Sequence, residues 1–253
     1  MEFKTANHRI DYDLQGPEDG PVIVFLHDGL GSKWAWREQI PAFTGAGYRV
    51  IAYDRWGYGR SDPRPGIDIP FFEDDLVDLE NLLDSLCPAP ANLVGHSDGG
   101  NIALAFAVRN PEKVRSLVCV AAHVYVQPKM RDGILKARQD FEMSERLRAG
   151  LARQHGDKTR QVFYHWFDGW YNERNLAWDM RPDLAHIRCP ALIVQGMDDE
   201  YATPQHAADI AAAVPNAGLF LAPQGAHRLP QQMPELFNCR ILEFVKSLHT
   251  TDL

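Results

Sequence analysis

Short apolar runs bounded by turn residues recur along the chain, and amphipathic stretches separate them. Runs of this length and continuity are typical of strands buried on both faces of a parallel sheet. The predicted strands are Val22–His27, Arg49–Asp54, Ala91–Ser97, Val114–Ala122, Ala191–Gly196 and Gly218–Ala222.

The stretches between the runs have the periodicity of helices. The predicted helices are Trp34–Phe43, Phe71–Leu86, Asn101–Arg109, Pro204–Val214 and Pro234–Leu248. Alternation of strands and helices on this scale predicts an α/β fold with a mostly parallel, doubly wound sheet. Phe3–Lys4 and Arg9–Leu14 predict an antiparallel hairpin at the edge of that sheet.

One region interrupts the alternation. Between residues 127 and 185 the strand pattern is absent, and the segment is first rich in charge and then in aromatic side chains. This pattern predicts a helical cap inserted between two strands. We therefore expect one domain, with residues 1–126 and 186–253 forming the core and residues 127–185 the cap.

Composition narrows the class of protein. The 253 residues are 45% hydrophobic, which suffices for a buried core, and the formal net charge is −8. Nucleic-acid binding is not expected, because it requires a basic surface that displaces counterions. The acidic balance favours cationic or neutral substrates.

The cysteines and the N-terminus bear on location. The four cysteines are widely spaced, without the CxxC spacing of a metal or redox site, and are expected to be free thiols in a reducing compartment. No signal peptide or membrane-spanning stretch is evident, so we expect a cytoplasmic protein that does not bind membranes. The pattern carries no signal for oligomeric state.

The strongest chemical signal is Gly-His-Ser-Asp-Gly at residues 95–99, a G-x-S-x-G match. The pentapeptide follows one predicted buried strand directly and begins a predicted helix. This is the setting of a nucleophile elbow, in which a serine occupies a strained turn between strand and helix. Ser97 is therefore the candidate nucleophile.

A serine nucleophile needs a base and an acid, and in this arrangement they follow in the order Ser, acid, His. Asp198, Asp199 and Glu200 follow the strand at residues 191–196, and His227 follows the last strand. The nine other histidines are terminal, lie in or near the cap or on a helix, or end strands as lining or structural groups: His8, His27, His96, His123, His155, His165, His186, His206 and His249.

An oxyanion hole would complete the machinery. One donor would be the amide of Asp98, and the other would come from the Gly-rich loop after the first core strand, where Gly29 is the first choice. No metal or organic cofactor is expected, because no metal-ligand spacing is present.

In order and spacing, FLHDGLGS, YDRWGYGRSD, LVGHSDGG, IRCPALIVQGMDD and PQGAHRLP resemble the α/β-hydrolase superfamily. The resemblance covers nearly the whole chain and implies a Ser-His-Asp triad and a cap after the sixth strand. In that family the acid stands three residues after the glycine that ends its strand. That rule selects Asp199 over Asp198.

A narrower resemblance, to the biphenyl-hydrolase-like proteins, comes from SDGG at the elbow and from the Trp-rich cap. In that group the aspartate after the nucleophile binds the α-ammonium of amino-acid esters, which implies the same role for Asp98. The alternative is that Asp98 only stabilises the N-terminus of its helix. His96 and Asp28 depart from the pattern of that group.

The remaining candidates concern substrate binding. Trp166, Trp170 and Tyr171 of the cap either line an apolar pocket or pack the cap onto the sheet. Asp28, Tyr125 and Tyr201 follow strands at the expected catalytic edge and could also contact substrate.

Together these features favour a serine hydrolase that cleaves carboxylic esters of small substrates, including α-amino-acid esters, through an acyl-enzyme. Two alternatives remain: hydrolysis of a carbon–carbon bond in a ring-cleavage diketone, and a ligand receptor on the same fold. The long, charged cap disfavours the receptor.

Overall fold

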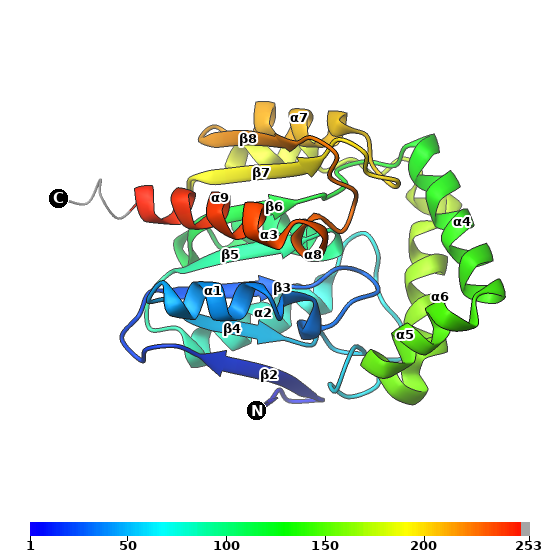
Figure 1. Cartoon of the computed structure of the whole chain (residues 1–253), viewed down its shortest axis with the longest axis horizontal. Helices are drawn as coiled ribbons and strands as arrows, with labels where there is room; N and C mark the ends of the chain where they lie inside the picture. The colour runs from blue at the N-terminus through cyan, green and yellow to red at the C-terminus, as the bar shows by residue number, and fades with distance from the viewer. Residues whose placement is uncertain (249–253) are drawn as a thin grey trace.

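The computed structural model describes residues 1–248, so His249 and the end of the expected core segment lie outside the described residues. An eight-stranded sheet with the order β1-β2-β4-β3-β5-β6-β7-β8 forms the centre of the molecule (Figure 1). β1 and β2 pair as a hairpin, β2 is antiparallel to β4, and the other pairings are parallel. The strands are β1 (Glu2–Lys4), β2 (Arg9–Gln15), β3 (Val22–Leu26), β4 (Arg49–Tyr53), β5 (Ala91–His96), β6 (Val114–Val120), β7 (Ala191–Gly196) and β8 (Ala217–Ala222). The predicted hairpin and mostly parallel sheet are confirmed.

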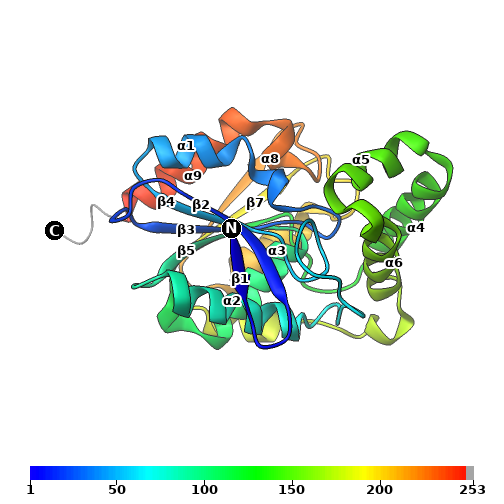
Figure 2. The same ribbon diagram turned by 90° about the horizontal axis from the view of Figure 1, so that it is seen from below.

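Helices cover both faces of the sheet (Figure 2). One face packs against α1 (Gln39–Gly45) and α9 (Pro234–Ser247), and their apolar side chains form one core cluster with that face. The other face packs against α2 (Glu73–Leu86), α3 (Asp98–Arg109) and α7 (Pro204–Ala213) in a second cluster. Continuously buried strands such as β3 and β5 are the consequence.

The predicted helix Trp34–Phe43 is wrong as a single element. The structure divides it into a 3-10 turn at Lys33–Trp36 and α1 at Gln39–Gly45. Pro41 explains the break, because it lacks an N–H and its ring would clash with the carbonyl four residues earlier in a continuous helix. In α1 it lies in the first turn, where no N–H is required. A short helix that the sequence pattern did not indicate, α8 (Leu229–Gln232), follows β8.

Residues 127–185, called the helical insertion below, connect β6 to β7 and lie beyond the carboxyl ends of the parallel strands (Figure 1). They contain α4 (Pro128–Met143), α5 (Glu145–His155) and α6 (Thr159–Trp170), and the shorter 3-10 turns Gly156–Lys158 and Glu173–Asn175; a further turn at Arg181–His186 crosses the expected boundary. Along residues 1–248, no helix is long and apolar enough to cross a membrane.

Candidate active site

Ser97 occupies the turn between β5 and α3. Its backbone has φ 54° and ψ −119°, a positive φ that side-chain-bearing residues rarely adopt and that costs about 1–3 kcal/mol. The turn is tight because α3 lies directly against β3: a Cβ on Gly99 would lie 2.2 Å from the carbonyl oxygen of Leu26. The serine therefore sits at the N-terminus of α3, where the helix dipole favours negative charge.

His227 and Asp199 reach Ser97 from two loops at the same edge of the sheet. His227 Nε2 lies 3.0 Å from Ser97 Oγ, and His227 Nδ1 lies 2.8 Å from Asp199 Oδ2. All three residues are buried. Asp198, in contrast, is exposed and makes no contact with His227 among the described hydrogen bonds. Hydroxyl, imidazole and carboxylate thus form one hydrogen-bonded chain.

The surroundings of the triad shift the pKa values of His227 and Asp199 in opposite directions. Burial by itself would lower the pKa of His227, but the charge and hydrogen bond of Asp199 outweigh it and leave the pKa raised. Burial would raise the pKa of Asp199, yet the imidazole and the amides of Ala202 and Tyr201 hold it well below its usual range. Asp199 is therefore a carboxylate at neutral pH, and His227 can gain a proton beside it.

Three polar side chains that the sequence pattern did not single out as supports orient the pair. Gln195 Nε2 donates to Asp199 Oδ2 over 2.7 Å, and Glu200 Oε2 accepts the amide N–H of His227 over 3.0 Å. His96 Nε2 donates to the carbonyl of His227 over 2.8 Å, and burial lowers the pKa of His96 to about 4. A neutral His96 thereby fixes the backbone of His227.

Gly29 and Asp98 flank Ser97 as the sequence predicts. A Cβ on Gly29 would lie 2.6 Å from Asp98 Oδ2 and 2.4 Å from the ring of Trp166, so only glycine fits this position. Outside the helix and strand ladders, no hydrogen bond among residues 1–248 uses the amide N–H of Gly29 or Asp98. Both amides are available to an oxygen bound at Ser97.

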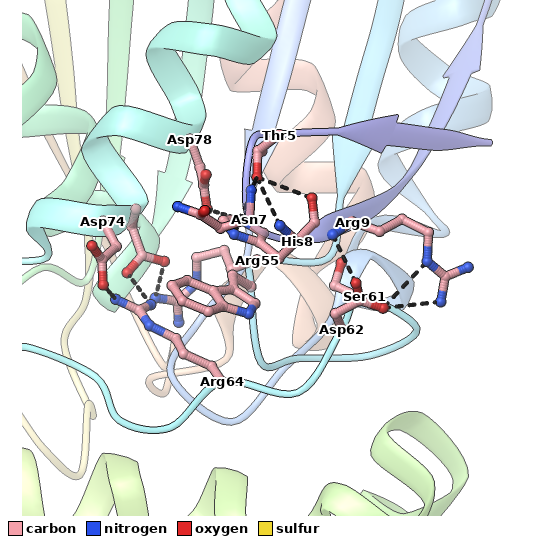
Figure 3. Close-up of polar contacts among 12 residues, drawn as sticks. Thr5, Asn7, His8, Arg9, Arg55, Ser61, Asp62, Arg64, Asp74 and Asp78 are labelled. Carbon is pink, nitrogen blue, oxygen red and sulfur yellow. Dashed lines mark hydrogen bonds and ion pairs between the residues drawn. The ribbon is translucent and has the colours of Figure 1, made fainter.

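The side chain of Asp98 lies in a buried charge network. Its Oδ1 accepts the indole N–H of Trp170 over 2.9 Å, and its Oδ2 lies 3.7 Å from Arg55 Nη2 without a hydrogen-bond partner of its own. Burial raises the pKa of Asp98 to about 6. Arg55 and Arg64, both labelled in Figure 3, donate to Asp75 of α2 over 3.3 and 2.7 Å. Arg55 is therefore shared between Asp75 and Asp98, and Asp98 Oδ2 can still accept a hydrogen bond.

The predicted aromatic contacts separate into two groups. Trp166 and Trp170 touch Gly29 and Asp98, and the ring of Tyr201 lies 4.8 Å from that of His227. Tyr125 and Tyr171 are not brought to this group. The Tyr125 hydroxyl donates to Asp209 over 2.9 Å, and Tyr171 stacks on Phe167.

Asp28 lies close to His96 and His227. Its Oδ1 is 3.9 Å from His96 Nδ1. Burial alone would raise the pKa of Asp28, but His96, Arg228 and His227 together lower it. A carboxylate here adds negative charge near His227, and it is one of the groups that raise the imidazole pKa.

The comparison with known proteins matches this geometry to a family. A profile described as the alpha/beta hydrolase family matches residues 23–238. The chain belongs to the alpha/beta hydrolase family and is a hydrolase. The predicted resemblance is thereby confirmed.

Relatives in this family carry different names. The serine hydrolase BPHL of Homo sapiens is 33% identical over 258 residues, covering 96% of this chain and 86% of its own length. A putative carbamate hydrolase RutD of Variovorax paradoxus (strain S110) is 29% identical, covering 93% and 96%. Among solved structures, the enol-lactonase from Burkholderia xenovorans LB400 superposes with a TM-score of 0.76 at 24% identity, over 97% of this chain and all of that one, which bears on the fold alone.

Proposed function

We propose that this protein is a serine hydrolase that cleaves carboxylic esters through an acyl-enzyme on Ser97. The observation that carries the proposal is the chain Ser97 Oγ, His227 and Asp199 Oδ2, with contacts of 3.0 and 2.8 Å. His227 accepts the serine proton as Oγ attacks the carbonyl carbon, and Asp199 stabilises the imidazolium. The imidazolium then protonates the leaving alcohol, and His227 activates water to release the acid.

The amides of Gly29 and Asp98 are the proposed oxyanion donors. The developing negative charge would lie at the N-terminus of α3, where these donors and the helix dipole stabilise it. The ring of Trp166 lies directly beside Gly29 and borders the proposed oxyanion site. The arrangement suits acyl transfer, in which charge develops on one oxygen.

Short-chain p-nitrophenyl esters test this proposal. Turnover that saturates, with a pre-steady-state burst of p-nitrophenol, is the expected result, because an acyl-enzyme forms before it is hydrolysed. A parallel assay with a carbamate and a lactone tests the reactions that the names of similar proteins indicate. Failure to hydrolyse any of the esters would contradict the proposal.

The pH dependence should report the raised pKa of His227. The base must be neutral to accept the serine proton, so kcat/KM should fall as the pH drops through a midpoint above about 6.5, the ordinary histidine value. Glu200 is one of the charges that raise this pKa, and Glu200→Gln should move the midpoint to lower pH. A pH–rate profile of both proteins measures the shift, and a midpoint below 6 in the wild type would contradict it.

We further propose that Asp98 binds the α-ammonium of amino-acid esters. The free acceptor capacity of its buried Oδ2, facing Gly29, supports this role. A valine benzyl ester and its desamino analogue, the 3-methylbutanoate, should differ in kcat/KM. A charge-assisted hydrogen bond contributes about 1.5–3 kcal/mol, so Asp98→Asn should reduce that preference by about 10- to 100-fold.

Asp28→Asn is the matched control for the ammonium site, because it removes a neighbouring carboxylate near His96 rather than next to Ser97. It should leave the preference within about threefold of wild type. If Asp98→Asn keeps the wild-type ratio of kcat/KM for the valine ester to kcat/KM for the desamino ester, Asp98 does not recognise the ammonium.

A further inference from the structure

A large cavity lies outside the group around Ser97. It has a volume of about 1180 Å³ and lies between α5 of the helical insertion and the segment that follows β3. Ser32 and Gln154 meet on its wall through a hydrogen bond of 2.9 Å. Arg228, which directly follows His227 in the chain, also lines it. The lining of the cavity, called the α5 groove below, therefore includes the residue that follows the proposed base in the chain.

The α5 groove is strongly cationic in a protein whose net charge is −8. Its lining contains Lys33 and five arginines: Arg37, Arg60, Arg146, Arg153 and Arg228. Only two carboxylates, Asp13 and Asp54, line it as well. These six positive charges come from separate segments of the chain and outnumber the carboxylates of the lining by six to two.

The two carboxylates of the groove are already occupied. Asp13 Oδ1 accepts from Lys33 Nζ over 2.6 Å. The two oxygens of Asp54 accept the amide N–H groups of Lys33 and Arg60, over 2.7 and 2.8 Å. Lys33 also contacts Asp11 Oδ2 at 2.7 Å, so its charge is compensated, whereas neither Asp13 nor Asp54 forms a described ion pair with an arginine.

Most of the arginines form no described ion pair, although Arg228 lies near enough to Asp28 to lower the pKa of that carboxyl. Among residues 1–248, no described ion pair involves Arg60, Arg146, Arg153 or Arg228, and Arg37 alone contacts a carboxylate, that of Glu38 at 3.3 Å. The four unpaired arginines are exposed. Unpaired guanidinium groups that face one cavity are suited to bind a carboxylate or phosphate through charge-assisted hydrogen bonds.

The groove also offers apolar surface. Trp34 is 63% exposed and Leu147 is 36% exposed, and both line the cavity. Arg37 lies over the Trp34 ring at 5.6 Å. A ligand that combined an apolar chain or ring with an anionic end would use both features.

We propose that the α5 groove binds the anionic end of the ester substrate, so that the preferred substrates are apolar esters that carry a carboxylate or phosphate away from the scissile bond. The groove steers such esters toward Ser97 and holds their charged end. This proposal rests on the proposed ester hydrolysis. It departs from the preference for cationic or neutral substrates that the net charge indicated, but only at the end of the substrate away from the scissile bond, so the proposed ammonium contact of Asp98 is unaffected.

Two pairs of esters test the groove, because the charge could lie on either half of the substrate. The first compares p-nitrophenyl hemisuberate with p-nitrophenyl octanoate. The second compares the butyrate ester of 4-hydroxyphenylacetate with that of 4-methylphenol. In at least one pair the anionic ester should have the higher kcat/KM, by about tenfold, and the preference should weaken as salt shortens the Debye length below about 8 Å.

Arg146 and Arg153 supply the test variants, because both lie on α5. The double variant Arg146→Glu with Arg153→Glu should reduce the anionic-to-neutral ratio of kcat/KM about tenfold or more, mainly through KM. The double lysine variant should keep most of the ratio, since it retains the charge. Arg188→Glu, at an exposed position before β7 and outside the groove lining, is the matched control and should leave the ratio unchanged.

A binding measurement separates recognition from turnover. Suberate should inhibit hydrolysis of p-nitrophenyl butyrate competitively in the wild type and at least fivefold more weakly in the double glutamate variant. Phenyl phosphate in the same assay compares phosphate with carboxylate as the bound group. The groove proposal would be overturned if anionic and neutral esters had equal kcat/KM in both pairs. It would also be overturned if the preference for the anionic ester persisted in the double glutamate variant. Absence of turnover with all four esters would instead overturn the hydrolase proposal.

Discussion

Replacing Ser97 with alanine is expected to lower kcat for p-nitrophenyl butyrate by about 10⁶-fold, the size of loss found when the nucleophile of a serine protease is removed. The reason is that, among residues 1–248, Ser97 Oγ is the hydroxyl that hydrogen-bonds to His227 Nε2, over 3.0 Å. The proposed oxyanion donors would remain in Ser97→Ala. We therefore expect residual catalysis above the rate in water rather than none.

Ser116→Ala is the matched control for this substitution. Ser116 is also a buried serine, but its hydroxyl donates to Asn92 Oδ1 over 2.7 Å within the sheet. Its removal should affect the free energy of unfolding more than kcat. Circular dichroism and thermal melting show whether each variant folds. A folded Ser97→Ala variant that retained more than about 1% of wild-type kcat would contradict the role of Ser97.

The second large effect is expected at the acid. Asp199→Asn should lower kcat by about 10⁴-fold, because an amide cannot replace both oxygens of this carboxylate. Oδ1 accepts the amides of Tyr201 and Ala202 over 2.7 and 2.9 Å, and Oδ2 accepts from Gln195 and His227. An asparagine must turn its NH₂ group toward one of these donors. If it faces His227, the imidazole takes the wrong tautomer for accepting the serine proton.

Asp198→Asn is the matched comparison, since the two aspartates are neighbours in sequence. Asp198 is exposed, whereas Asp199 is 1% exposed. Neutralising an exposed charge should change kcat by less than about threefold. Measured kcat values for the two variants that agree within a factor of ten would contradict the assignment of Asp199 as the acid.

The sequence predicted the sheet and the grouping of Ser97, Asp199 and His227 for a common reason. Parallel strands end at one edge of the sheet, so residues that follow β5, β7 and β8 must meet there even though they are far apart in the chain. Hydrophobic runs locate the strands, and the order of the motifs then locates the side chains. Helix boundaries were less accurate: one predicted helix is interrupted where Pro41 is incompatible with a continuous helix.

Features that depend on how side chains pack were not predictable. Gln195 looks like an ordinary strand residue in sequence, and its hydrogen bond to Asp199 depends on where the loop after β7 places that carboxylate. The α5 groove draws arginines from several segments, while the net charge pointed the other way. The directions of Tyr125 and Tyr171 likewise depend on their contacts with α7 and α6.

The measurement that tests the nucleophile most directly is covalent labelling with a fluorophosphonate, followed by mass spectrometry of the digested protein. One phosphonyl group per chain is expected, on the peptide that contains Ser97, with loss of ester turnover in proportion to labelling. His227→Ala should slow the labelling strongly, because the unassisted hydroxyl is a weak nucleophile. Labelling at another residue, or full ester turnover by a protein labelled at Ser97, would contradict the mechanism.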